Sequence, residues 1–175
     1  DACLAMARAL DFPVLVRVTH FSAEAVLQVL DMGAVGVVAP HISNAEQASD
    51  LVRFAHFGNG GRGFAGATRW AGYGKQTMAQ VLAQSSRETV VIAQIEEPEA
   101  LANVEGIAAT HGIDGVFLGP SDMSVSMGYT DTNSKELLEA LKRTGDAALA
   151  AGKAYMTFVP NAKKAADWVQ YGPHM

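Results

Sequence analysis

Residues 90–128 constrain the fold most, because they place one amphipathic helix between two buried strands. Val90–Ile95 is an apolar run rich in β-branched residues, as is typical of a strand buried on both faces. Pro98 then opens a segment whose apolar residues recur three and four positions apart, as on one face of a helix, up to Gly112. Ile113–Leu118 is a second buried run. This order predicts a βαβ unit with two adjacent, parallel strands.

An acidic residue follows each of these two strands. Glu96 comes directly after the first, and Asp122 follows the second within the turn Gly119-Pro120-Ser121-Asp122. The carboxyl ends of parallel strands share one sheet edge, where ligands and active sites collect in α/β folds. Two carboxylates at that edge suit Mg²⁺ or Mn²⁺, with water and substrate at the remaining positions. The residues alone also permit a solvated loop acid at Glu96 and a helix N-cap at Asp122.

The rest of the chain repeats the alternation of strands and helices. Strands are predicted at 14–18, 35–39, 90–95, 114–118 and 154–159. Helices are predicted at 1–10, 25–32, 45–56, 75–86, 98–111, 123–127, 134–151 and 161–171. A (β/α)₈ TIM barrel has eight strands and typically about 250 residues. The pattern therefore predicts an α/β fold of the TIM-barrel type that is partial, with about five of eight βα units, in one domain over residues 1–175.

Two further residues follow strands. Arg17 stands near the end of the first strand between Val16 and Val18. Such an arginine is often a surface salt-bridge partner, but in a central strand its charge needs a specific partner. His41 follows the second strand and could reach the same sheet edge. We leave His41 out of the candidate site, because a lone histidine is more often a packing or surface group.

Composition excludes several classes of function. The net charge of −5, without a basic stripe, argues against a nucleic-acid partner. The single cysteine, Cys3, cannot form an internal disulfide, which favours a cytoplasmic location. No apolar run reaches about 18 residues, so no membrane span is predicted. The chain has no initiator Met and opens within a helical segment, so we expect a fragment of a longer gene product.

The motifs of the central stretch closely resemble those of the HpcH/HpaI family of metal-dependent class II pyruvate aldolases. They are Q-I-E, then G-I-D-G-V-F-L-G-P-S-D-M-S, then S-M-G-Y, and a looser similarity runs from about Pro13 to about Gly172. The resemblance implies that Glu96 and Asp122 bind a divalent metal, Mg²⁺ or else Mn²⁺ or Co²⁺. Gln94 would orient metal-bound water or substrate.

The resemblance also assigns the groups that bind the substrate. The backbone N–H groups of Ser121 and Asp122, after Gly119-Pro120, would hold the pyruvate carboxylate as helix N-termini hold anions. Arg17 would contact the keto oxygen and stabilise the enolate. The glycine-rich segment 57–74 fits neither a P-loop nor a dinucleotide fingerprint. The resemblance makes it a structural loop at the site mouth with a part in substrate gating.

The function so implied is cleavage of a 4-hydroxy-2-oxo acid to pyruvate and an aldehyde by a homo-oligomer, a hexamer by resemblance. No lysine stands at a matching strand end, which weighs against Schiff-base chemistry. The chain would cover the third to seventh strands of the family's barrel, and the acid/base His and Asp of the early segment have no counterpart here. Two alternatives stay open: a citrate-lyase β-subunit-like acyl-CoA lyase, and a catalytically silent fragment that binds metal or 2-oxo acid or only assembles with partners.

Overall fold

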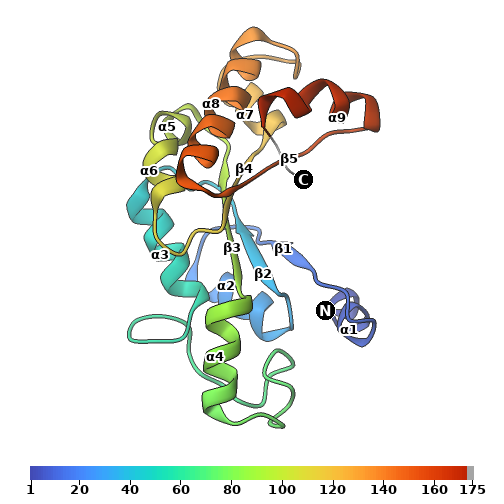
Figure 1. Ribbon diagram of the computed structural model, residues 1–175, viewed down its shortest axis with the longest axis vertical. Helices are drawn as coiled ribbons and strands as arrows, with labels where there is room; N and C mark the ends of the chain where they lie inside the picture. Colours follow the sequence, from blue (N-terminus) through green and yellow to red (C-terminus); the bar gives the residue numbers. More distant parts are fainter. Residues whose placement is uncertain (173–175) are drawn as a thin grey trace. The chain divides into compact units, whose positions relative to one another are not determined.

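The computed structural model (Figure 1) describes residues 1–172. The chain divides into two compact units. Unit 1 comprises Asp1–Ala39 and Asp50–Val91, and unit 2 comprises Pro40–Ser49 and the chain from Ile92 onward. The single domain over residues 1–175 stays a prediction.

Five strands and nine α-helices occur in the described chain. The strands are β1 (Leu15–Arg17), β2 (Gly36–Ala39), β3 (Val90–Ile95), β4 (Gly115–Leu118) and β5 (Ala154–Thr157). The helices are α1 (Ala2–Ala9), α2 (Ala23–Asp31), α3 (Ala45–Ala55), α4 (Met78–Glu88), α5 (Pro98–Ala102), α6 (Val104–Ala109), α7 (Pro120–Ser126), α8 (Lys135–Ala151) and α9 (Ala162–Trp168), with a 3₁₀ turn at Val169–Tyr171. The strands form one sheet in chain order. The α/β class with five parallel strands, of the partial TIM-barrel type, is confirmed.

In unit 1, β1 pairs in parallel with β2, and Arg17 lies opposite Val38. Ser22 caps α2 (Ala23–Asp31), because its Oγ accepts a hydrogen bond from the N–H of Ala25. Gly36 needs its lack of a side chain, since a Cβ there would stand 2.3 Å from the carbonyl oxygen of Val90. This close approach fixes the start of β2 within the unit.

In unit 2, β4 pairs in parallel with both β3 and β5, and the three strands end level. Leu118 lies opposite Ile95 on one side and Thr157 on the other. The long helix α8 packs against β4 and β5, where the buried Tyr155 donates a hydrogen bond from its hydroxyl to the carbonyl oxygen of Leu141. Burial raises the pKa of Tyr155 above its ordinary value. The predicted adjacency of the two strands of the βαβ unit is confirmed.

The predicted single helix over 98–111 is wrong, because it breaks at Asn103 into α5 and α6. The side chain of Asn103 donates a hydrogen bond to the carbonyl oxygen of Ser43, a contact that only the tertiary structure supplies. The helix predicted from residue 75 begins instead at Met78. Thr77 caps it in a reciprocal pair with Gln80, and such a capping box sets a helix start.

Two further differences concern α7 and β5. The helix expected at 123–127 begins earlier, at Pro120, whose fixed φ suits the first position of a helix. The strand expected to reach 159 ends at Thr157. Asp122 therefore lies in the first turn of α7.

Replacing Gly145 in α8 by alanine is expected to destabilise unit 2 by about 1–3 kcal/mol. A helical glycine replaced by alanine ordinarily stabilises by about 1 kcal/mol. At Gly145, however, the added Cβ would stand 2.1 Å from the carbonyl oxygen of Tyr171 and 3.2 Å from the ring of Tyr155. Urea unfolding measures the change in the free energy of unfolding.

The matched control is Gly106→Ala in α6. There the nearest atom to an added Cβ is the Cβ of Ala45 at 3.7 Å, an ordinary contact. Gly106→Ala is expected to stabilise by up to about 1 kcal/mol. Equal stabilisation by both substitutions would contradict the close packing described around Gly145.

Candidate active site

Glu96 is a buried carboxylate fixed at both oxygens. It follows β3 directly, and only 1% of it is exposed. Its Oε1 accepts a hydrogen bond from the side-chain amide of Gln94 at 2.6 Å, and its Oε2 accepts one from the backbone N–H of His41 at 3.0 Å. Because donors on two sides hold the carboxylate, its orientation at the sheet edge is set before any ligand binds.

Gly119 stands against this carboxylate at the end of β4. Its N–H donates to the carbonyl oxygen of Ile95 at 3.0 Å, so the pairing of β3 with β4 continues one residue further. A Cβ on Gly119 would stand 3.1 Å from Nε2 of Gln94 and 3.1 Å from Cγ of Glu96. The backbone of Gly119, with φ −86°, suits any residue, so space rather than conformation requires glycine here.

The predicted carboxylate-binding turn follows at once. Pro120 is the first residue of α7, and Ser121 and Asp122 complete its first turn with exposed side chains. The first N–H groups of a helix have no acceptor within the helix, and a carboxylate in the first turn is favoured by the helix dipole. Asp122 follows the carboxyl end of β4, just as Glu96 follows that of β3, and these two strands are adjacent and parallel.

Two contributors at this edge were missed by the sequence reasoning. The hydroxyl of Thr157, at the end of β5, donates to the carbonyl oxygen of Leu118 at 2.9 Å and so holds the end of β4 just before Gly119. His41, which the sequence analysis left out, contacts Glu96 by its backbone and has its Nδ1 3.1 Å from Oε1 of Glu97. The only sequence signal was that each residue follows or ends a strand of the same sheet.

Arg17 belongs to unit 1, at the end of β1, where its side chain is exposed. It lines a cavity of about 340 Å³ together with residues of α2, among them Glu24 and Gln28. The structure thus brings Gln94, Glu96 and Gly119 together within unit 2. The role expected of Arg17 stays a prediction.

The donor set in unit 2 fits a hard divalent cation only if water and substrate complete it. Within residues 1–172, no cluster of three or more His, Cys, Asp or Glu side chains is arranged to hold a metal ion. Magnesium in proteins is commonly held by one or two carboxylates, with waters and substrate atoms at its other positions. The fixed carboxylate of Glu96, with Asp122 after the neighbouring parallel strand, offers ligands of this kind.

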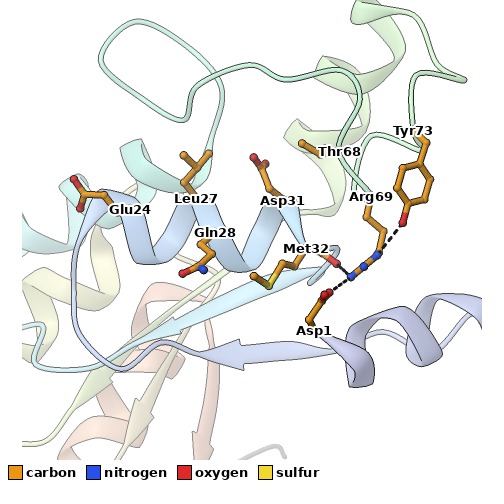
Figure 2. Close-up of a pocket in the computed structure, with 9 residues that line it drawn as sticks. All are labelled: Asp1, Glu24, Leu27, Gln28, Asp31, Met32, Thr68, Arg69 and Tyr73. Atoms are coloured by element: carbon orange, nitrogen blue, oxygen red, sulfur yellow. Dashed lines mark hydrogen bonds and ion pairs between the residues drawn. The ribbon is translucent and has the colours of Figure 1, made fainter.

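The glycine-rich segment 57–74 contributes to another surface feature within unit 1. A pocket of about 480 Å³ lies between α2 and this segment. Arg69 and Tyr73 are among the residues that line it (Figure 2). The guanidinium of Arg69 donates to Asp1, to the carbonyl oxygen of Met32 and to the hydroxyl of Tyr73 (Figure 2). None of the predicted site residues lines this pocket. Arg69 therefore binds the segment to the rest of unit 1, and Tyr73 contacts Arg69 within the segment.

No helix of the described residues combines the length and the apolar character needed to cross a membrane.

Gly119→Ala is expected to weaken divalent-cation binding about tenfold or more with little loss of stability. The added methyl group would press on the side chains of Gln94 and Glu96, and changes next to metal ligands typically cost about ten- to a hundredfold in affinity. Mn²⁺ titration followed by electron paramagnetic resonance measures the affinity. Wild-type affinity in a folded Gly119→Ala variant would show that this glycine does not bound the cation site.

Comparisons with known proteins agree on one family. The family model described as HpcH/HpaI aldolase/citrate lyase matches residues 2–175. A hydroxypyruvate/pyruvate aldolase of Delftia acidovorans is 36% identical over 163 residues, 88% of this chain and 59% of that protein. A 4-hydroxy-2-oxovalerate aldolase of Novosphingobium aromaticivorans is 38% identical over 136 residues, 76% of this chain and 49% of that protein.

A solved structure shares the fold. The crystal structure of an HpcH/HpaI aldolase/citrate lyase family protein from Burkholderia cenocepacia J2315 matches with a TM-score of 0.90 and 30% identity. The match covers 98% of this chain and 69% of that one. The chain thus spans about half to three fifths of the two curated aldolases that it resembles.

Proposed function

This chain belongs to the HpcH/HpaI aldolase/citrate lyase family, and we propose that it functions as a metal-dependent class II aldolase. The reaction is cleavage of a 4-hydroxy-2-oxo acid to pyruvate and an aldehyde. One observation carries the proposal: a buried carboxylate, Glu96, is held at both oxygens beside the glycine that opens the Gly-Pro-Ser-Asp turn. The names of the curated relatives support the same chemistry.

Glu96 and Asp122 are the residues that hold the cation in this proposal. Both follow the carboxyl ends of adjacent parallel strands, and carboxylate oxygens suit Mg²⁺, Mn²⁺ or Co²⁺. When bound, the cation supplies positive charge where the negative charge of the pyruvate enolate develops. Among these three cations we propose Mg²⁺ as the preferred one.

The chain's own groups bind and orient the substrate. Gln94, whose amide already donates to Glu96, orients the water or substrate beside that carboxylate. The backbone N–H groups of Ser121 and Asp122 hold the substrate carboxylate after the turn at Gly119 and Pro120, as N–H groups at helix starts do for anions. Arg17 stabilises the charge on the 2-oxo oxygen, by resemblance to the family.

Proton handling marks the limit of what this chain provides. The residues that the family uses as an acid/base pair have no matching motif in residues 1–175. Proton transfer by a positioned side chain typically contributes about 10²–10⁴-fold to a rate. The chain is therefore expected to bind cation and pyruvate and, without such a pair, to turn over slowly.

The aldolase proposal is tested by release of pyruvate, detected with lactate dehydrogenase and NADH, from 4-hydroxy-2-oxo acids of several chain lengths with Mg²⁺, Mn²⁺ or Co²⁺. Pyruvate release that requires a cation supports it. Turnover of acyl-CoA thioesters instead would establish the citrate-lyase-like alternative. Cation and pyruvate binding by this chain without any turnover would establish the silent alternative.

Oligomeric state and location are proposals too. A homo-oligomer, hexameric by resemblance, is checked by light scattering coupled to size-exclusion chromatography. A cytoplasmic location rests on the single cysteine and stays a prediction.

A further inference from the structure

The backbone at His41 adopts a conformation that residues with a side chain rarely take. Its φ is +57°, in the left-handed region, where only Asp11 and Tyr73 join it among the non-glycine residues of 1–172. Such conformations persist where surrounding contacts enforce them, and they concentrate at functional sites. His41 is exposed, with 57% of its side chain accessible, so burial of the imidazole does not explain the strain.

The contacts of His41 do account for it. In this conformation its backbone N–H points at Oε2 of Glu96, 3.0 Å away, while Gln94 holds Oε1 from the other side. The imidazole Nδ1 lies 3.1 Å from Oε1 of Glu97 and 3.4 Å from Oε2 of Glu96. Two adjacent carboxylates thus bind the backbone and the side chain of one residue.

We propose that His41 is a positioning residue for Glu96. Its left-handed backbone directs the N–H onto Oε2 and so orients the carboxylate toward a divalent cation, while the contact between imidazole and Glu97 helps hold that backbone. The inference deepens the proposed function and rests on it for the cation. The positioning of Glu96 itself is observable in the metal-free protein.

The proposal predicts an order among substitutions that side-chain chemistry alone does not. Asparagine and glycine adopt positive φ readily, so His41→Asn and His41→Gly keep the N–H on Glu96 although both lose the imidazole. A β-branched residue is disfavoured at positive φ, so His41→Val turns the N–H away. Alanine adopts positive φ less readily than asparagine or glycine and more readily than valine. His41→Ala therefore replaces His41→Val in the test if the valine variant does not fold.

The test combines two measurements on the whole chain. Mn²⁺ titration by electron paramagnetic resonance is expected to show binding weakened about 10- to 100-fold in His41→Val, and within about threefold of wild type in His41→Asn and His41→Gly. In the metal-free protein, NMR is expected to show the amide of residue 41 exchanging with solvent at least about tenfold faster in Glu96→Ala than in wild type. Circular dichroism and urea unfolding identify the folded variants.

Equal Mn²⁺ affinity in wild type and folded His41→Val would overturn the proposal, as would equal losses in the asparagine and valine variants. An amide at residue 41 that exchanges at the same rate with and without Glu96 would also overturn it. If wild type binds no Mn²⁺ but the amide depends on Glu96, the proposed function fails and the positioning of Glu96 stands. The two failures are thereby separated.

Discussion

Glu96→Gln and Asp122→Asn are each expected to lower metal-dependent pyruvate release by about a thousandfold or more. Both substitutions keep the size of the side chain but remove a negative charge that a hard divalent cation requires. A bound cation contributes several kcal/mol of charge stabilisation, and each ~1.36 kcal/mol is a factor of ten in rate. The measurement is kcat/KM of this chain for a 4-hydroxy-2-oxo acid at saturating Mn²⁺.

The two variants differ in their expected effect on stability. Glu96→Gln is expected to be the more destabilising of the two. The new side chain can still accept a hydrogen bond from the N–H of His41, but it brings an amide group into a buried place, whereas the side chain of Asp122 is exposed. Glu105→Gln is the matched control, because it removes an exposed carboxylate that pairs with Arg143 in the same unit. Its rate is expected to equal that of wild type. Full activity in either Glu96→Gln or Asp122→Asn would contradict the assignment of that carboxylate.

Arg62→Ala is expected to destabilise unit 1 by about 3 kcal/mol, at the low end of the range for breaking a buried ion pair. Arg62 is 4% exposed and donates hydrogen bonds from Nε and Nη2 to Asp31. Its guanidinium carbon lies 4.5 Å from the ring centre of Phe57 and 5.1 Å from that of Trp70. Burial lowers the pKa of Arg62, and Asp31 opposes the shift. The free energy of unfolding in urea measures the loss.

Arg53→Ala is the control for this prediction. Arg53 makes the same kinds of contact, an ion pair with Asp50 and a guanidinium 4.7 Å from the ring centre of Phe54, but 46% of its side chain is exposed. Exposed pairs of this kind contribute up to about 1 kcal/mol. If Arg62→Ala cost no more than Arg53→Ala, the account of segment 57–74 as a loop held by a buried arginine would be wrong.

The sequence predicted the strands well, because each is an apolar run bounded by glycine, proline or a charged residue. Gln94 and Glu96 could be placed at the end of this strand from the Q-I-E motif, whereas only the structure shows that both side chains are buried. Gly119 was read as part of a motif, and the structure adds the physical reason, which is the space beside Glu96.

What the sequence could not predict depends on contacts between distant residues. His41 contacts Glu96 through a backbone N–H, a group that every residue except proline carries. The residue type at position 41 therefore does not predict this contact. The break at Asn103 depends on a carbonyl oxygen of Ser43. Thr157 holds the carbonyl oxygen of Leu118 by a hydroxyl that also suits a plain strand residue. Each contact exists only once the chain has folded.

The segment 57–74 was interpreted as a structural loop with a part in gating. Its structural role agrees with the buried contacts of Arg62 and with the bonds of Arg69 to Asp1 and Met32. Both arginines are engaged by acidic groups or carbonyl oxygens of unit 1. The gating role stays a prediction.

The most direct test of the account is calorimetric titration of this chain with pyruvate, with and without Mn²⁺, in parallel with a variant that carries Glu96→Ala and Asp122→Ala. The account predicts that pyruvate binds only when Mn²⁺ is present and that the double variant, still folded, binds none. Pyruvate binding of equal strength without the metal or in the folded double variant would contradict the cation site at the ends of β3 and β4. So would the absence of binding by the folded wild-type chain in the presence of Mn²⁺.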